Sequence, residues 1–319
     1  MAQTTRTAAA VAAVAIALSL AACSGSEEPP AEDSLTPVTV GVIPITDTAA
    51  LWLGDQEGFF EEEGIDLTIE TTDGGATSMA GVVSGDYDFA FSNMVSLMVA
   101  QDQGLPVRYV TNGTSVEGTE EGFGAVVVPE DSDIEQPADL VGRTVSVNNL
   151  SNITGATASY AVEQDGGDPN GIDYVELPFP DMPAALASGN IDAAMIVEPF
   201  LTAVRDEGAR VVAWNYQAIP DMDIAGYFAT TETIESDPEL VERFTRAMNR
   251  SLERAGEDPE AVRAVVGTYT EISEDARARM NLPVFRTEFN VAAAEELGEA
   301  LVRYGIVENA PDVAAILPQ

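Results

Sequence analysis

The feature that most constrains this chain is a stretch that occurs twice in variant form. The first copy runs from Thr68 to Met98 and the second from Glu176 to Leu201. Each follows a Gly-Ile-Asp tripeptide and reaches the motif Ser-Gly-x-x-Asp-x-Ala, at Ser84 to Ala90 and at Ser188 to Ala194. Each then enters an apolar run that ends in polar residues. A series of matches in the same order indicates an internal structural repeat.

The residues upstream of the two copies also correspond. Val38 to Pro44 reads VTVGVIP and Thr144 to Asn149 reads TVSVNN, which are both typical of strands. The full pattern of strand, helix, strand, helix, strand is that of a parallel α/β unit, and it occurs twice. We therefore expect two similar lobes with a cleft between them.

The N-terminus predicts export and lipid anchoring. The apolar run Ala8 to Leu20 is shorter than the ~20 residues that span a bilayer, so residues 1–22 are expected to be a signal peptide. Leu20-Ala21-Ala22-Cys23 resembles the bacterial lipoprotein box, and Cys23 is the single cysteine. We expect Cys23 to carry the lipid and residues 23–37 to form a flexible tether. The alternative for Cys23 is a small buried thiol.

The charge and the missing histidine limit the possible functions. The chain has 54 Asp plus Glu against 14 Lys plus Arg, a formal net charge of −40, and no histidine. Such an acidic surface repels phosphate backbones, so we expect no nucleic-acid partner. Without histidine there is no Ser-His-Asp triad, His general base or His-ligated zinc. We expect a binding protein rather than an enzyme, with no cofactor and no metal.

The acid excess also predicts adaptation to high salt. All 14 basic residues are arginine, and self-repulsion among the acids is relieved by screening. The alternative is compositional drift in a GC-rich genome, which explains arginine but not the excess of acids.

Later segments predict how the lobes connect. Ala125 to Pro129 is expected to cross into the second lobe and Asp223 to Thr230 to return to the first. Four helices are expected to follow, at Pro238 to Ala255, Pro259 to Thr270, Ser273 to Met280 and Val291 to Tyr304. Six arginines at helical spacing are expected to be surface ion-pair partners: Arg243, Arg246, Arg250, Arg254, Arg277 and Arg279.

With these residues in view, the chain resembles the substrate-binding proteins of bacterial ABC importers, in the group that includes nitrate, alkanesulfonate, taurine and thiamine-precursor (aminopyrimidine) binders. The resemblance lies in five stretches: Trp52 to Ile69, Ser84 to Phe91, Gln103 to Val110, Pro137 to Val147 and Ala185 to Phe200. Fungal pyrimidine synthases that share the fold consume one of their own histidines, which this chain lacks, so only the binding role carries over.

The resemblance implies an α/β, type II periplasmic-binding-protein fold, with two doubly wound lobes joined by two crossing strands. Lobe 1 is expected to comprise residues 38–124 plus 225–319, and lobe 2 residues 125–224. It implies an exported monomer, anchored by lipid to the outer face of the cell membrane, that delivers a small solute to an ABC permease and its ATPase. A lipid-anchored sensory module on the same fold is the alternative.

Ligand contacts are expected from loops at the carboxyl ends of the strands, where helix N-termini converge. For each polar residue there, a helix cap is the alternative role; for Trp52 it is a core aromatic, and for Glu198 a brace at the hinge. The expected contacts are Thr46, Asp47, Trp52, Gly74, Gly75, Ser92, Asn93, Asn149, Ser151, Asn152, Thr154, Asp181 and Glu198.

The charges at these loops favour a nitrogen-bearing ligand. None of the loops carries an arginine, whereas Asp47, Asp181 and Glu198 supply carboxylates. An aminopyrimidine or similar thiamine-precursor-like heterocycle can donate N–H groups to these acids and lie against Trp52 or Phe179. Taurine, an alkanesulfonate or nitrate stays open, because the amides and hydroxyls of residues 149–154 can hold an oxyanion.

Overall fold

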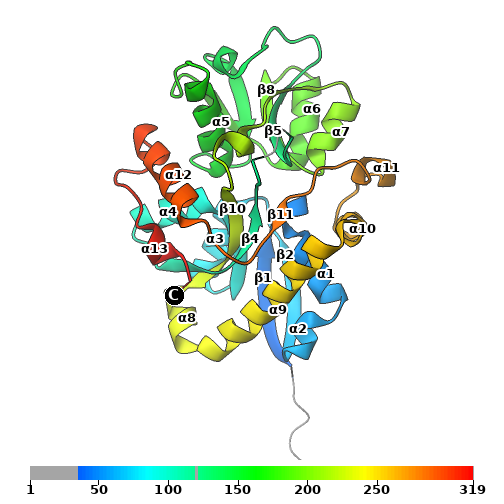
Figure 1. The fold of residues 1–319 in the computed structure, drawn as a ribbon, viewed down its shortest axis with the longest axis vertical. Coiled ribbons are helices and arrows are strands. Elements are labelled where there is room, and N and C mark those ends of the chain that lie inside the picture. Colours follow the sequence, from blue (N-terminus) through cyan, green and yellow to red (C-terminus); the bar gives the residue numbers. More distant parts are fainter. Residues whose placement is uncertain (1–34, 119–120, 319) are drawn as a thin grey trace, which may run out of the picture. The chain divides into compact units, whose positions relative to one another are not determined.

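The computed structural model describes residues 35–118 and 121–318. The predicted signal peptide, Cys23 and most of the tether therefore lie outside the described residues. The described part contains a six-stranded sheet in the order β11-β4-β10-β3-β1-β2 and a five-stranded sheet in the order β7-β6-β8-β5-β9 (Figure 1). The strands are β1 Thr36–Val42, β2 Ile65–Thr71, β3 Phe89–Asn93, β4 Val107–Ser115, β5 Gly124–Val128, β6 Thr144–Val147, β7 Asp173–Glu176, β8 Ala193–Val197, β9 Arg210–Ala213, β10 Asp223–Thr230 and β11 Val284–Phe285.

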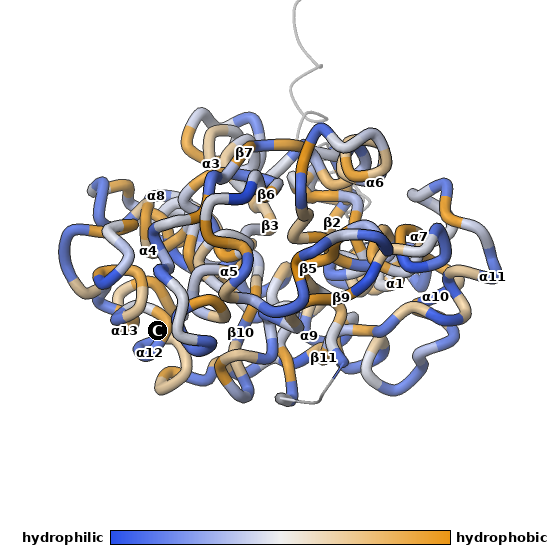
Figure 2. The backbone as a smooth tube through the Cα atoms, turned by 90° about the horizontal axis from the view of Figure 1, so that it is seen from above, coloured by the Kyte–Doolittle hydropathy of each residue, from blue (hydrophilic) through white to orange (hydrophobic). Residues whose placement is uncertain are grey.

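Helices connect and cover these strands. The α-helices are α1 Ala49–Gln56, α2 Phe59–Glu62, α3 Gly75–Ser84, α4 Met94–Asp102, α5 Ile153–Gln164, α6 Met182–Ala187, α7 Phe200–Asp206, α8 Thr231–Ser236, α9 Pro238–Glu257, α10 Pro259–Tyr269, α11 Glu274–Arg277, α12 Val291–Arg303 and α13 Val313–Ile316. Four short 3-10 helices are η1 Thr46–Thr48, η2 Pro137–Leu140, η3 Phe179–Asp181 and η4 Asn215–Ala218. In Figure 2 the outer helices alternate between hydrophilic and hydrophobic segments, as expected for helices with one buried face.

The sequence repeat is a structural repeat. Strand β1 is parallel to β2 and β3, and β6 is parallel to β7 and β8. The aspartate of each Ser-Gly-x-x-Asp-x-Ala motif makes the same contact: Asp88 Oδ2 accepts from Thr39 N, and Asp192 Oδ2 accepts from Thr144 N, both at 2.8 Å. The glycines of the motifs have φ of 82° and 70°, a left-handed conformation that glycine adopts without strain. Each motif therefore ends a helix and fixes the start of the next parallel strand.

Two glycines shape the six-stranded sheet and its helices. Gly58, with a φ of 79°, separates α1 from α2. Gly113 lies within β4, which extends to Ser115. A Cβ on Gly113 would lie 2.9 Å from the carbonyl oxygen of Ala225, so glycine at this position permits the close pairing of β4 with β10.

The C-terminal helices pack on the six-stranded sheet. Phe244 of α9 stacks on Phe89 of β3, with ring centroids 4.0 Å apart. The ion-pair prediction is correct for four of the six arginines, which form the pairs Arg246 with Glu63, Arg250 with Glu62, Arg254 with Glu57, and Arg279 with Asp206. It is wrong for Arg243 and Arg277, which donate to backbone carbonyl groups instead.

Candidate functional site

A narrow cavity of about 20 Å³ lies between loops and strands of the two sheets. From the six-stranded sheet and its loops come Asp47, Phe91 and Asn93, and from the five-stranded sheet and its helices come Asn152 and Phe179. The other lining residues are Ile43, Ile45, Asn148, Ile153, Thr154, Val197, Tyr216, Ile224 and Ala225. This volume is far below the ~300 to 1,000 Å³ of small-molecule sites, so the walls lie close together and must separate to admit an organic ligand.

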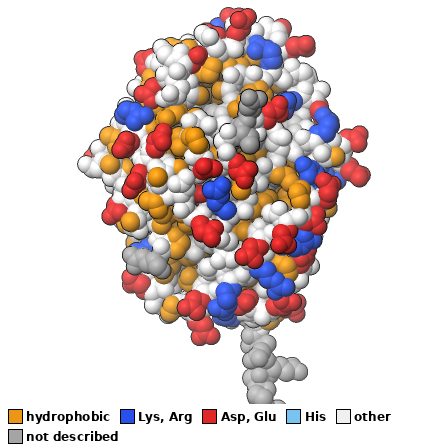
Figure 3. Space-filling view, in the orientation of Figure 1, with side chains coloured by type: hydrophobic (Ala, Val, Ile, Leu, Met, Phe, Trp, Pro, Cys, Tyr) orange, Lys and Arg blue, Asp and Glu red, His pale blue; other side chains and the backbone are white. Residues whose placement is uncertain are grey.

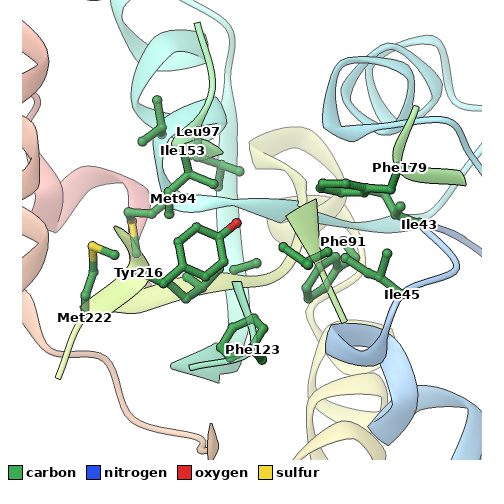
Figure 4. Close-up of a cluster of buried hydrophobic side chains, with 14 of the residues drawn as sticks. Ile43, Ile45, Phe91, Met94, Leu97, Phe123, Ile153, Phe179, Tyr216 and Met222 are labelled. Carbon is green, nitrogen blue, oxygen red and sulfur yellow. The ribbon is translucent and has the colours of Figure 1, made fainter. Parts of the chain in front are cut away.

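Apolar side chains form most of the walls. Figure 4 shows Phe179 beside Ile43 and Phe91 beside Ile45, with Tyr216 on a different side of the cluster. These residues are all buried. A pocket with mainly apolar walls and a few polar groups is typical of sites for small organic ligands.

Two helices begin at the cavity with asparagine caps. Asn93 Oδ1 accepts from Ser96 N at 3.0 Å at the start of α4, and Asn152 Oδ1 accepts from Thr154 N at 3.2 Å at the start of α5. Both asparagines therefore have the capping role and a place in the cavity wall. The capping bond of Asn152 uses only its oxygen, and its Nδ2 is buried without a hydrogen-bond partner.

Asp47 is the single charged residue among those that line the cavity. The residue is in η1, in the connection between β1 and α1, and it is 3% exposed. Thr114 Oγ1 donates to Asp47 Oδ1 over 3.4 Å, and Oδ2 has no partner. Burial raises the pKa of Asp47 to about 7, because hydrogen bonds offset only part of the cost of removing the charge from water.

Glu198 is fully buried at the end of β8, and its carboxylate is occupied by protein donors. Oε2 accepts from Thr202 N at 3.0 Å, and Oε1 accepts from Thr202 Oγ1 at 2.7 Å and from Asn281 N at 3.1 Å. Burial raises the pKa of Glu198, and these hydrogen bonds oppose that shift. The geometry is that of a brace between segments, and Glu198 is not part of the cavity wall.

The predicted glycines allow two close approaches, that of Gly74 to the loop after β6 and that of Gly75 to β3. A Cβ on Gly74 would lie 2.3 Å from Asn149 Oδ1, and a Cβ on Gly75 would lie 2.6 Å from Ser92 Oγ. Asn149 Oδ1 also accepts from Ala76 N at 3.5 Å, which joins the loop after β6 to the start of α3.

The remaining predicted contacts lie in other surroundings. The ring of Trp52 stacks on Tyr269, with centroids 4.7 Å apart, which is the core role considered for it. Thr46 is buried, with Oγ1 3.8 Å from the sulfur of Met280. Ser151 and Asp181 are exposed. The predicted residues that line the cavity are Asp47, Asn93, Asn152 and Thr154.

Sequence reasoning missed several lining residues. Tyr216 is in η4, between β9 and the return strand β10, and no local signal in the sequence marks it as facing the cavity. Phe91 is within β3, where it reads as an ordinary core aromatic. Within residues 35–118 and 121–318, no group of acidic, histidine or cysteine side chains is arranged to hold a metal ion. No described helix is long and apolar enough to cross a membrane.

The fold is that of known solute-binding proteins. The structure of an alkanesulfonate-binding protein, SsuA of Xanthomonas axonopodis pv. citri bound to MOPS, superposes with a TM-score of 0.77 at 16% identity, covering 88% of this chain and 98% of that one. The predicted type II periplasmic-binding-protein fold is thereby confirmed.

The sequence defines the family more narrowly. Residues 45–262 match the family described as NMT1/THI5 like, and the chain belongs to this family. Among similar proteins, the formylaminopyrimidine-binding protein of Halalkalibacterium halodurans is 24% identical over 66% of this chain and 63% of its own length. The taurine-binding periplasmic protein of Escherichia coli is 26% identical over 59% of this chain and 57% of its own length. The matches thus cover less than two thirds of these two relatives.

Proposed function

We propose that the protein captures a small organic solute outside the cell and delivers it to an ABC permease and its ATPase, without catalysis. The observation that carries the proposal is the cavity between the two sheets, whose wall includes the buried, unpartnered atoms Asp47 Oδ2 and Asn152 Nδ2. Buried polar groups are normally paired, so such atoms in a cavity wall indicate positions for ligand atoms. The names of the family relatives agree with a binding role.

The favoured ligand is a small nitrogen heterocycle such as an aminopyrimidine. The cavity wall contains no arginine, and its charged residue is an acid. A sulfonate or nitrate would therefore meet no cation to balance its charge. Taurine, alkanesulfonate or nitrate import is the second candidate, because α4 and α5 begin at Asn93 and Asn152, which line the cavity, and helix N-termini favour anions.

Capture is proposed to occur by hinge closure of two lobes, residues 38–124 plus 225–319 and residues 125–224. The protein is proposed to act as a monomer, tethered to the outer face of the membrane through lipid on Cys23. A sensory module on this fold would use the same cavity, but would be coupled to a signalling partner instead of a permease.

Two measurements test the proposal. Titration calorimetry in high salt with formylaminopyrimidine, taurine, an alkanesulfonate and nitrate should show tight binding of one class of solute without turnover. Fractionation of cells should place the wild-type chain in membranes and Cys23→Ser in the soluble exported fraction, with Ser24→Ala as the matched control. Consumption of a bound solute by the purified protein would overturn the binding role, and membrane retention of Cys23→Ser would overturn the lipid anchor.

A further inference from the structure

Asp47 is a buried acid without a balancing cation. It is 3% exposed, and its one hydrogen bond from another side chain is the 3.4 Å contact from Thr114. The other carboxylate oxygen, Oδ2, is buried without a partner. Burying a carboxylate without a compensating charge is unfavourable, and a buried polar atom without a hydrogen-bond partner adds to that cost. The fold therefore maintains an acceptor that its own groups do not satisfy.

The groups around Asp47 do not neutralise it. Thr114 of β4 faces it, as do three tyrosines close enough to interact with its charge: Tyr216 of η4, Tyr227 of β10 and Tyr269 of α10. Burial is the main cause of the raised pKa of each tyrosine, and the Asp47 charge adds to it, so all three remain uncharged at neutral pH. A donor from a bound molecule can satisfy Oδ2.

Asn152 supplies a hydrogen-bond donor to the cavity, in contrast to the acceptor that Asp47 supplies. This residue enters the wall from the start of α5, and its Nδ2 is a buried donor without a partner. The apolar side chains of Ile43, Phe91 and Phe179 also line the cavity (Figure 4). The wall thus presents one acceptor, one donor and apolar surface, a pattern that matches a flat heterocycle carrying both N–H and acceptor atoms.

We propose that Asp47 is the specificity-determining residue of this cavity, accepting an N–H group of the ligand at Oδ2 and rejecting sulfonates and other oxyanions by its charge. The assignment rests on the proposed function, because it concerns the same cavity. The ligand class is a small neutral or cationic molecule with an N–H donor for Asp47 and an acceptor for Asn152. An anion at this position would have like charge to the carboxylate, in a site without a cation.

The test compares the wild-type chain with Asp47→Asn by titration calorimetry at about pH 8, where the carboxylate is largely ionised. The probes are formylaminopyrimidine, taurine, methanesulfonate and nitrate. Asp66→Asn is the matched control, because Asp66 is exposed on β2 and the substitution changes the net charge equally. Thermal melting establishes that each variant is folded.

The wild type and Asp66→Asn are expected to bind formylaminopyrimidine and none of the three anions. Asp47→Asn is expected to lose roughly 10- to 100-fold in affinity for formylaminopyrimidine, because a hydrogen bond to a charged group is replaced by a weaker one. Tight binding of an anion by the wild type would overturn the assignment and leave solute capture intact, whether or not Asp47→Asn folds. Formylaminopyrimidine binding that is unchanged in folded Asp47→Asn would also overturn it. Absence of binding by all four probes would count against both the assignment and the proposed function.

Discussion

The backbone N–H of Asn281 donates to Glu198 Oε1 at 3.1 Å, joining the end of β8 to the segment that follows α11. The carbonyl oxygen of Glu198 accepts from Thr46 N at 3.1 Å, so the same residue also holds the η1 segment that carries Asp47. Glu198 thus connects the five-stranded sheet to two distant parts of the chain. Its position explains why a buried acid beside the cavity does not contribute to the cavity wall.

Removing this carboxylate should reduce stability more than it alters ligand choice. Glu198→Ala leaves three donor groups, Thr202 N, Thr202 Oγ1 and Asn281 N, without their acceptor. We expect a loss of about 3 to 5 kcal/mol in the free energy of unfolding, measured by denaturant titration, from the unpaired buried groups and the lost packing. Glu207→Ala, at an exposed glutamate after α7, should change it by less than about 0.5 kcal/mol. A reversal of ligand preference in folded Glu198→Ala would argue for direct contact instead.

The raised pKa of Asp47 predicts how stability depends on pH. In the folded chain Asp47 retains its proton up to a pH of about 7, whereas the unfolded chain loses it near the ordinary value of 3.8. Between these values the folded state binds more protons, so the contribution of Asp47 to stability is greatest at low pH and falls as the pH rises toward 7.

Asp47→Asn removes this pH dependence. Relative to the wild type, the variant should gain up to about 4 kcal/mol in the free energy of unfolding between about pH 4 and about pH 8, in the ligand-free state. Denaturant titrations of both chains across this range measure the difference, and Asp66→Asn is the control for net charge. A difference that is constant with pH would show that the buried carboxylate ionises at its ordinary pKa.

Much of the fold follows from local sequence patterns. Two parallel α/β units are predictable from the repeated motif and from the strands that precede each copy. The motif aspartates, Asp88 and Asp192, bind the backbone N–H groups of Thr39 and Thr144, so the same contact recurs at the same place in each unit. Asp47, Asn93 and Asn152 were predictable as site candidates, since each lies where the chain passes from a strand to the next α-helix. The lobe boundaries and the complete set of ligand contacts stay predictions.

The rest of the site depends on partners that are distant in sequence. Trp52 stacks on Tyr269 and Glu198 binds Asn281, and neither pairing has a signal in the local pattern. Tyr216 reaches the cavity only because η4 precedes the return strand at this point. The local sequence pattern indicates which residues lie at the end of a strand. It does not indicate which side chains from later in the sequence pack against those residues.

An ion pair between α7 and the segment after α11 should contribute to closure of the proposed lobes. Asp206 at the end of α7 accepts from two nitrogens of Arg279, at 2.5 and 2.6 Å. Arg279→Gln should weaken ligand binding about threefold, measured by calorimetry, because this contact joins segments that closure would bring together. Arg250→Gln is the matched control, since it removes a similar exposed pair between α9 and α2 that lies away from the cavity. Equal effects of the two variants would mean that the Arg279 pair supports only the fold.

Salt should stabilise this chain despite its ion pairs. Acidic residues outnumber arginine 54 to 14, and Figure 3 shows acids spread over the viewed face with arginines among them. Exposed pairs contribute only about 0.2 to 1 kcal/mol each, so their weakening by salt is small compared with relief of repulsion among the excess acids. At 1 M sodium chloride the screening length is about 3 Å. The melting temperature should therefore rise between low and molar salt, by roughly 10 °C or more. Sucrose at matched osmolality is the control for excluded-solute effects, and a melting temperature that stays constant or falls in salt would contradict the proposed salt adaptation.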